Sequence, residues 1–119
     1  GHARAMHNLG QMYLDGLGVN KDLSEAVRWL KHGAEAGAAE CQSDLAFCYE
    51  EGNGVEASMA LAERWYLAAA EQGNAQAQYN LGGLHFQRGD MQTAIAWCKK
   101  AAAGGNQDAA QMLAQLGQR

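Results

Sequence analysis

Apolar side chains recur along the chain at helical spacing, in short segments. In the first segment, the positions i, i+4, i+7 and i+8 are apolar and lie on one face of a helix, and they hold Ala5, Leu9, Met12 and Tyr13. The pattern stops at Gly16, and glycine readily adopts the left-handed backbone conformation that ends many helices. The segment therefore predicts an amphipathic helix that is closed by a glycine turn.

A second apolar stripe follows this turn and predicts a partner helix. Asp22 stands at the expected N-cap, and Glu25 three residues later completes a capping box. The stripe ends at Gly37. Its members are Ala26, Trp29, Leu30 and Gly33. We therefore expect two short helices that pair through their apolar faces.

The same helix-turn-helix pattern is repeated along the chain. Residues 36 positions apart match in the pairs Leu9/Leu45, Tyr13/Tyr49, Gly16/Gly52, Gly18/Gly54, Val19/Val55, Ala26/Ala62, Trp29/Trp65 and Gly37/Gly73. A third copy keeps this offset at Leu81, but its second half is shorter because the loop is reduced to Arg88-Gly89-Asp90. The copies predict one domain over residues 1–119, with repeats at about 2–37, 38–73 and 74–105 and a partial capping repeat at 106–119.

The matched positions also suggest individual structural roles. Ser58 and Asp90 occupy the N-cap position of the second helix in the later copies. Small residues that would let paired helices approach closely are Gly10, Ala46 and Gly82. Glycines expected to cap helices are Gly16, Gly37, Gly52, Gly73, Gly89 and Gly105. Indoles expected to fill the space between neighbouring pairs are Trp29, Trp65 and Trp97.

One of these copies carries a family resemblance. The pattern Ala-x-x-x-Leu-Gly-x-x-Tyr-x-x-Gly-x-Gly-Val-x-x-Asp-x-x-x-Ala-x-x-Trp runs from Ala5 to Trp29 and resembles the Sel1-like repeat, a close relative of the tetratricopeptide repeat. The third copy, from Tyr79 to Ile95, resembles a tetratricopeptide repeat more closely. The resemblance implies an all-α fold: a right-handed α/α superhelix, or solenoid, of about three helix-turn-helix repeats plus a C-terminal capping helix.

Composition argues against several functional classes. The formal net charge of −4 disfavours binding to a nucleic-acid backbone, which requires clustered Lys and Arg. The four histidines show no metal-ligand spacing with one another or with the cysteines, so we expect no metal and no cofactor. The Ser-x-x-Lys motif of acyl-enzymes is absent, because positions 27, 46 and 61 hold other residues. We therefore expect no catalytic residues and no enzyme activity.

The three cysteines are expected to serve in packing. Cys41 and Cys48 are seven residues apart on one predicted helix, about 10 Å between Cα atoms, which is too far for a disulfide. Both fall on small core positions of the repeat. The lack of a disulfide framework favours a reducing compartment. The sequence shows no targeting signal, and the compartment stays open between the cytoplasm and a bacterial periplasm.

By the same resemblance, the first helix of each pair lines a concave face that meets a partner. The expected partner-binding residues are Arg4, His7, Asn8, Gln11, Glu40, Asp44, Phe47, Glu50, Glu51, Gln76, Tyr79, Asn80 and Phe86. Asn80 matches the asparagine that binds a peptide backbone in tetratricopeptide repeats. The aromatic residues Phe47, Tyr79 and Phe86 are not required by the core pattern, which favours partner binding, although a neighbouring helix could instead cover them.

The middle of this expected face is acidic. It carries Glu40, Asp44, Glu50 and Glu51, and Arg4 is the obvious counter-charge. A clamp for a peptide carboxylate requires basic residues at these positions, so that ligand is disfavoured. The pattern instead suggests an extended segment with a basic and an apolar residue.

Together these features predict a non-catalytic protein-protein interaction module, an adaptor or scaffold that binds a partner peptide or helix in its concave groove. The alternative is a structural or self-assembling repeat array that acts as an oligomerisation or envelope-assembly element, because repeat arrays expose apolar ends unless polar caps close them. The expected partner is a protein or peptide, with no nucleic acid and no membrane insertion. A monomer is favoured over an oligomer.

Overall fold

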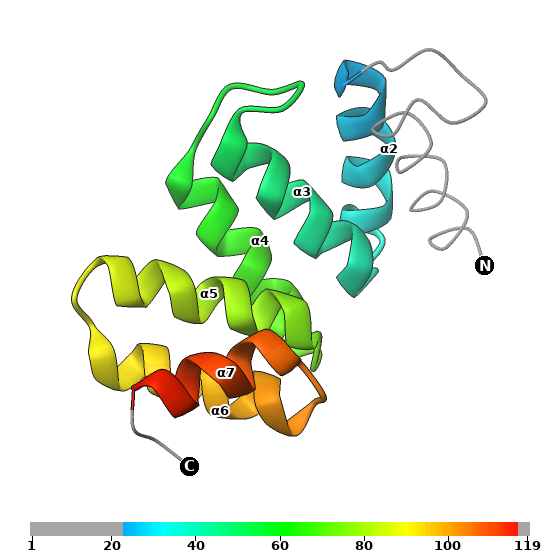
Figure 1. Ribbon diagram of the computed structural model, residues 1–119. Helices are drawn as coiled ribbons and strands as arrows, with labels where there is room; N and C mark the ends of the chain where they lie inside the picture. The colour runs from blue at the N-terminus through cyan, green and yellow to red at the C-terminus, as the bar shows by residue number, and fades with distance from the viewer. Residues whose placement is uncertain (1–22, 117–119) are drawn as a thin grey trace. The chain divides into compact units, whose positions relative to one another are not determined.

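The computed structural model describes residues 23–116 of the chain, and all of their regular secondary structure is helical (Figure 1). The elements are α2 (Leu23–Glu35), α3 (Ala39–Glu51), α4 (Met59–Glu71), α5 (Ala75–Gln87), α6 (Met91–Ala103) and α7 (Gln107–Gln115). No strand occurs within that range, so the predicted all-α class is confirmed. The first predicted helix, with Gly10, Gly16 and the Asp22 cap, lies outside the described residues.

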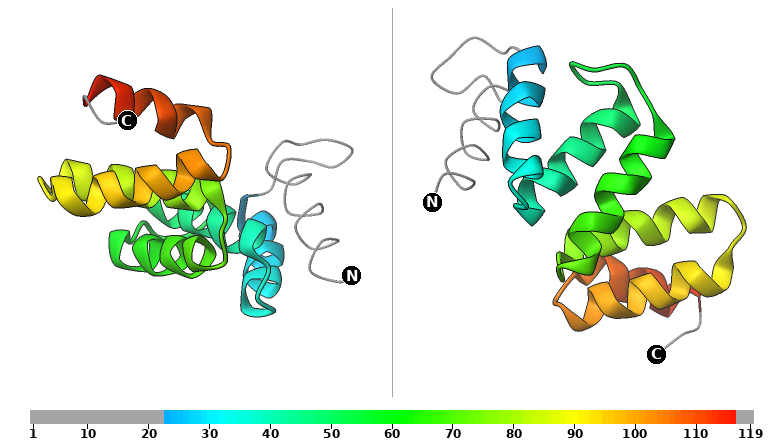
Figure 2. Two further views of the ribbon diagram at one scale, coloured as in Figure 1. Left: turned by 90° about the horizontal axis from the view of Figure 1, so that it is seen from below. Right: turned by 180° about the vertical axis from the view of Figure 1, so that it is seen from behind.

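The chain divides into two compact units, residues 1–65 and 66–119, and the division falls inside α4. In the first unit α2 packs against α3. In the second unit α5 packs against α6, and α6 packs against α7. Figures 1 and 2 show α5 and α6 running side by side in opposite directions, joined by a tight turn. The helix-turn-helix pairing predicted for the third repeat is therefore present as α5 and α6, whereas α2 with α3 and α6 with α7 are contacts between successive repeats.

Each unit has a core of small and aliphatic side chains. On α2 the fully buried residues Ala26 and Leu30 are four positions apart, which matches one face of a helix. They are joined in the first unit by Leu45 on α3. In the second unit Leu81 is almost completely buried, and a cluster formed by Cys98, Ala101, Ala109 and Leu113 joins α6 to α7. Because most of these side chains are small, the helices can approach closely.

The tryptophan series is only partly buried. Trp29, Trp65 and Trp97 are all half-buried, and the largest fully buried side chain is Tyr66, at 0% exposure. The reason lies in helical spacing. On α4 the buried positions follow the stripe i, i+4, i+7 and i+8, and they hold Ala62, Tyr66, Ala69 and Ala70. Trp65 lies at the edge of that stripe and is half-buried. Trp29, which was expected in the buried stripe of α2, is half-buried as well.

The turns between repeats share one hydrogen-bond pattern. After α2, the amide of Ala38 donates to the carbonyl of Gly33 at 3.1 Å, and the equivalent amides of Asn74 and Asn106 make the same bond after α4 and α6. This bond closes the end of a helix when the preceding residue has positive φ. The predicted glycine caps within the described residues are confirmed by positive φ at Gly37, Gly52, Gly73, Gly89 and Gly105.

Side-chain caps start most of the helices. Ser58 and Asp90 accept hydrogen bonds from the third amide of α4 and α6, at 3.2 and 3.3 Å, which confirms both predicted N-caps. Asn74 and Asn106 cap α5 and α7 in the same way at 2.8 Å, although the sequence analysis did not assign them this role. Ala38 stands at the matching position before α3 and makes no side-chain cap.

The close-approach role predicted for Gly82 is confirmed. A Cβ atom added there would lie 2.9 Å from the sulfur of Cys98 on α6, which is closer than real Cβ atoms come. Gly82 therefore allows α5 and α6 to pack at their observed separation. Its counterpart Ala46 is also fully buried.

Candidate functional site

The helix α3 carries the candidate partner-binding residues of the second repeat. Glu40, Phe47 and Glu51 are exposed there, and Asp44 and Glu50 are half-buried. Glu40, Asp44, Phe47 and Glu51 follow the spacing i, i+4, i+7 and i+11, so they form one stripe along the helix. We call Glu40, Asp44, Phe47, Glu50 and Glu51 the α3 acidic face. Ser43 on the same helix is buried.

Phe47 is the most exposed large hydrophobic side chain in the described part of the chain, at 48%. Nothing in the packing of α3 requires it, because the helix is held by the buried residues on its other side, such as Leu45 and Cys48. Its sequence neighbours on the same stripe are the carboxylates of Asp44 and Glu51. The α3 acidic face therefore offers an aromatic contact surrounded by negative charge.

The cysteines of the described residues are packing residues, two of them on α3 and one on α6. Cys41, Cys48 and Cys98 are buried and free of disulfides, which confirms the predicted packing role. Burial, followed by the nearby charge of Asp44, raises the pKa of the Cys41 and Cys48 thiols to about 11. Burial also raises the pKa of Cys98. The thiolate is the nucleophilic form, so the raised pKa values disfavour reaction at these thiols.

The exposed side of α5 is polar but not acidic. The amide of Gln76 donates to the side-chain oxygen of Asn80 at 3.1 Å, and Asn106 donates to Gln76 at 3.3 Å. Asn80, expected to bind a peptide backbone, is therefore one member of a chain of three amides. Phe86 lies further along α5 and is 41% exposed. We call Gln76, Asn80 and Phe86 the α5 amide face.

Tyr79 is placed differently from the other two aromatic candidates. It is half-buried and packs against the cluster of Cys98, Ala101, Ala109 and Leu113. The neighbouring helices thus cover part of its ring, which was the alternative considered for these residues. The candidates of the first repeat, Arg4, His7, Asn8 and Gln11, lie outside the described residues.

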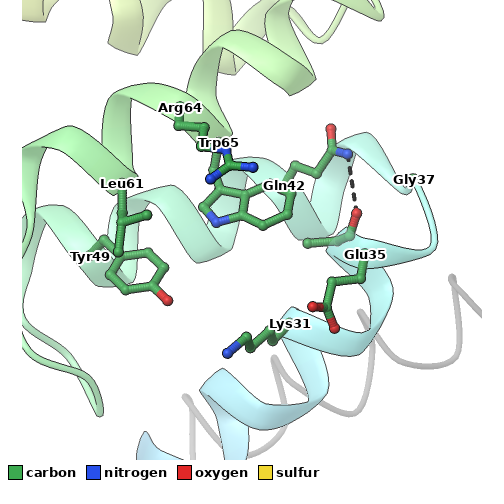
Figure 3. Close-up of a pocket in the computed structure, with 9 residues that line it drawn as sticks. Lys31, Glu35, Gly37, Gln42, Tyr49, Leu61, Arg64 and Trp65 are labelled. Carbon is green, nitrogen blue, oxygen red and sulfur yellow. Dashed lines mark hydrogen bonds between the residues drawn. The ribbon is translucent and has the colours of Figure 1, made fainter.

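The first unit also contains a pocket that the sequence analysis missed. It has a volume of about 650 Å³ and opens between α2, α3 and α4 (Figure 3). Its lining residues are Lys31, Ala34, Glu35, Gly37, Gln42, Tyr49, Leu61, Arg64 and Trp65. Gln42 has a counterpart, Gln78, 36 positions later, and the lining residues Gly37, Tyr49 and Trp65 belong to pairs that repeat at the same offset. Each glutamine donates to a carbonyl of the preceding helix, Ala34 at 3.2 Å and Ala70 at 3.1 Å.

Residues 23–116 contain no group of three or more His, Cys, Asp or Glu side chains that could hold a metal ion. In the same range, no helix combines the length and the apolar character needed to cross a bilayer. The serine at the start of α4, Ser58, is engaged as an N-cap.

Comparison with known families identifies the repeat. The Sel1 repeat matches in three segments, residues 3–37, 39–74 and 75–106. The chain belongs to the Sel1 repeat family. No curated protein matches it closely. Sel1 repeat proteins are generally protein-interaction scaffolds, and the family is generally non-catalytic.

Two solved Sel1 structures are similar to this chain. A Sel1 repeat protein from Oxalobacter formigenes has a TM-score of 0.82 and 36% sequence identity, with 90% of this chain and 46% of that protein covered. A protective antigen of uropathogenic Escherichia coli strains, which displays an SLR fold, has a TM-score of 0.89 and 36% identity, with 93% of this chain and 25% of the antigen covered. This chain thus spans about half of the first protein and a quarter of the second.

Proposed function

We propose that this Sel1 repeat chain is a non-catalytic interaction module, and that its α3 acidic face binds an extended partner segment with a basic and an apolar residue. The observation that carries this proposal is the exposure of Phe47 between carboxylates on one stripe of α3. An exposed aromatic ring anchors an interface because it buries a large apolar area at a small loss of side-chain entropy. The surrounding carboxylates select a basic neighbour in the partner and speed its association.

The α5 amide face is proposed as a second contact surface of different character. Its amides are suited to hydrogen bonds with a peptide backbone, and Phe86 supplies an exposed apolar contact. It carries none of the charge that marks the α3 acidic face. We therefore assign charge selection to α3 alone.

Binding of a short model peptide tests the proposal. The probe is a labelled peptide of alternating Lys and Leu, blocked at both ends, and its control replaces each Lys by Gln. We expect the Lys peptide to bind more tightly, and the variant Phe47→Ala with Glu51→Lys to lose most of this binding, by fluorescence anisotropy. Both side chains are exposed, so the fold is expected to survive the changes.

The second unit offers the matched control. Met91→Ala combined with Asp108→Lys removes an exposed apolar side chain and reverses an exposed charge, both on helices of the second unit. This variant should bind the Lys peptide as the unmodified chain does. Equal loss in both variants, or equal binding of the Lys and Gln peptides, would contradict the proposal.

A further inference from the structure

The pocket of the first unit combines three helices that the repeat brings together. Lys31 and Glu35 come from α2, Tyr49 from α3, and Arg64 with Trp65 from α4. We call this site the α2–α4 pocket. Figure 3 shows the side chains of Lys31 and Arg64 and the hydroxyl of Tyr49 directed toward the open space. None of the five residues of the α3 acidic face lines it.

Positive charge gathers in this pocket in a chain that is acidic as a whole. The sequence contains nine Lys and Arg residues and thirteen Asp and Glu residues. Two of these cations line the α2–α4 pocket, and Glu35 is the acidic residue of its lining. Within the described part of the chain, neither Lys31 nor Arg64 forms an ion pair. Arg28 on the same helix, by contrast, is paired with Glu25 at 3.3 Å.

The rest of the lining combines apolar side chains with Tyr49 and the amide of Gln42. Trp65 and Leu61 are half-buried at the wall, and Tyr49 is only 8% exposed. The base is held by the hydrogen bond from the buried amide of Gln42 to the carbonyl of Ala34. A site whose wall is already formed binds without a large cost of ordering side chains.

We propose that the α2–α4 pocket binds an acidic segment of a partner protein. A carboxylate side chain lies between Lys31 and Arg64, and the next apolar side chain lies on Trp65 and Leu61. The argument rests on charge complementarity. Two exposed cations without carboxylate partners fit an anionic group, and the guanidinium of Arg64 can hold both carboxylate oxygens. The volume matches that of pockets that enclose a small group of atoms rather than a whole domain.

This site differs from the proposed function in both position and charge preference. The α3 acidic face selects a basic segment, whereas the α2–α4 pocket selects an acidic one. A failure of one proposal therefore leaves the other untouched. The two peptides used as probes have opposite charge, so each experiment reports on its own surface.

The test uses a blocked peptide of alternating Glu and Leu and a control in which Gln replaces Glu. Binding is followed through tryptophan fluorescence, because Trp65 lines the pocket. We expect the Glu peptide to change the fluorescence in a saturable way, and a Trp65→Phe variant to lose that change. We expect the Gln peptide to bind about fivefold more weakly, as exposed charge pairs contribute little each.

Charge variants locate the binding in the pocket. Lys31→Met with Arg64→Met should weaken binding of the Glu peptide about fivefold, whereas Glu35→Gln should strengthen it because a repelling carboxylate is removed. The matched control is Lys99→Met with Lys100→Met, two exposed cations of the second unit. All of these side chains are exposed, and circular dichroism verifies that each variant is folded.

Three outcomes would overturn the proposal. The first is no saturable response to the Glu peptide up to about 1 mM, the range of weak specific binding. The second is equal weakening by the Lys99 and Lys100 changes. The third is a second copy of this chain as the occupant: light scattering would then show a mass that rises with concentration and falls back in the Lys31 and Arg64 double variant.

Discussion

Two connections reverse the chain between the helices of a repeat, and they differ in length. One joins α3 to α4, and the other joins α5 to α6. The first runs over residues 52–58 and the second over residues 88–90, a difference of four residues that accounts for the shortening of the third repeat. Both contain a glycine of positive φ and both end in a side-chain cap, Ser58 or Asp90. The short turn is sufficient to reverse the chain, so chain reversal alone does not account for the extra residues of the long loop.

The long loop makes a contact at Gly54 that the short turn lacks. A Cβ atom added there would overlap the backbone carbonyl of Leu23, at the start of α2. The long loop thus lies directly against the preceding helix of the first unit, whereas Gly89 in the short turn has open space around it. The second repeat, which has the long loop, therefore contacts the repeat before it through backbone atoms of the loop as well as through the packing of α3 on α2.

Substitution of Gly54 tests this contact and should change the stability most. Gly54→Ala and Gly89→Ala both place a side chain on a positive φ, at 71° and 82°, which costs about 1–2 kcal/mol in each case. Gly54→Ala must in addition displace the loop from the Leu23 backbone, so we expect it to lower the free energy of unfolding by about 1–3 kcal/mol more than Gly89→Ala. Urea denaturation of both variants measures the difference. Equal losses would show that the loop does not depend on this contact.

A second comparison concerns the helix starts that follow the repeat turns. Asn74 and Asn106 cap α5 and α7, whereas Ala38 leaves the start of α3 without a side-chain acceptor. Asn74→Ala should therefore cost about 1 kcal/mol of stability, and Ala38→Asn should add a similar amount. The backbone at Ala38 already has the extended conformation of its counterparts, with φ −75° and ψ 116°.

Thermal unfolding of the two variants and of their combination measures these effects. The combined variant should return close to the stability of the unmodified chain, because the two sites are far apart in sequence and share no partner. A destabilised Ala38→Asn variant would mean that the start of α3 cannot accommodate the longer side chain.

Repeat offsets predicted the features that depend on local backbone geometry. Glycine caps and the Ser58 and Asp90 caps follow from short-range hydrogen bonds, which the spacing of residue types reveals directly. Burial was predicted less well. Trp65, expected to fill the space between neighbouring helix pairs, is half-buried, because its angular position on α4 puts it at the edge of the stripe that Tyr66 occupies.

The candidate site was predictable only along single helices. The stripe from Glu40 to Glu51 follows from helical periodicity, and Glu40, Phe47 and Glu51 are exposed on it. The α2–α4 pocket depends on side chains from three helices. Arg64 repeats Arg28 at the offset of 36, but Lys31 has Leu67 at that offset, so the pair of cations is not repeated. Such a site arises from packing between elements, which periodicity does not describe.

The smallest expected effect concerns the two caps that end the long loop and the short turn. Asp90 accepts hydrogen bonds from Thr93 and lies 3.5 Å from His85, and these contacts, the bonds from Thr93 foremost, hold the pKa of its carboxyl below the ordinary value. Its folded pKa is thus lower than its unfolded pKa. The capping contribution is therefore complete above the unfolded carboxyl pKa and is lost as the pH falls through the lowered pKa.

Ser58 performs the same task before α4 without titrating. Acid should consequently weaken the start of α6 and leave the start of α4 unchanged. The backbone amide shifts of Thr93 and Leu61, followed by NMR from about pH 7 to about pH 2, report on the two caps. Thr93 should titrate with a midpoint below the ordinary carboxyl value, Leu61 should not follow it, and Asp90→Ser should abolish the transition at Thr93. A Thr93 transition that survives in Asp90→Ser would assign the acid response to another group and end the distinction between the two caps.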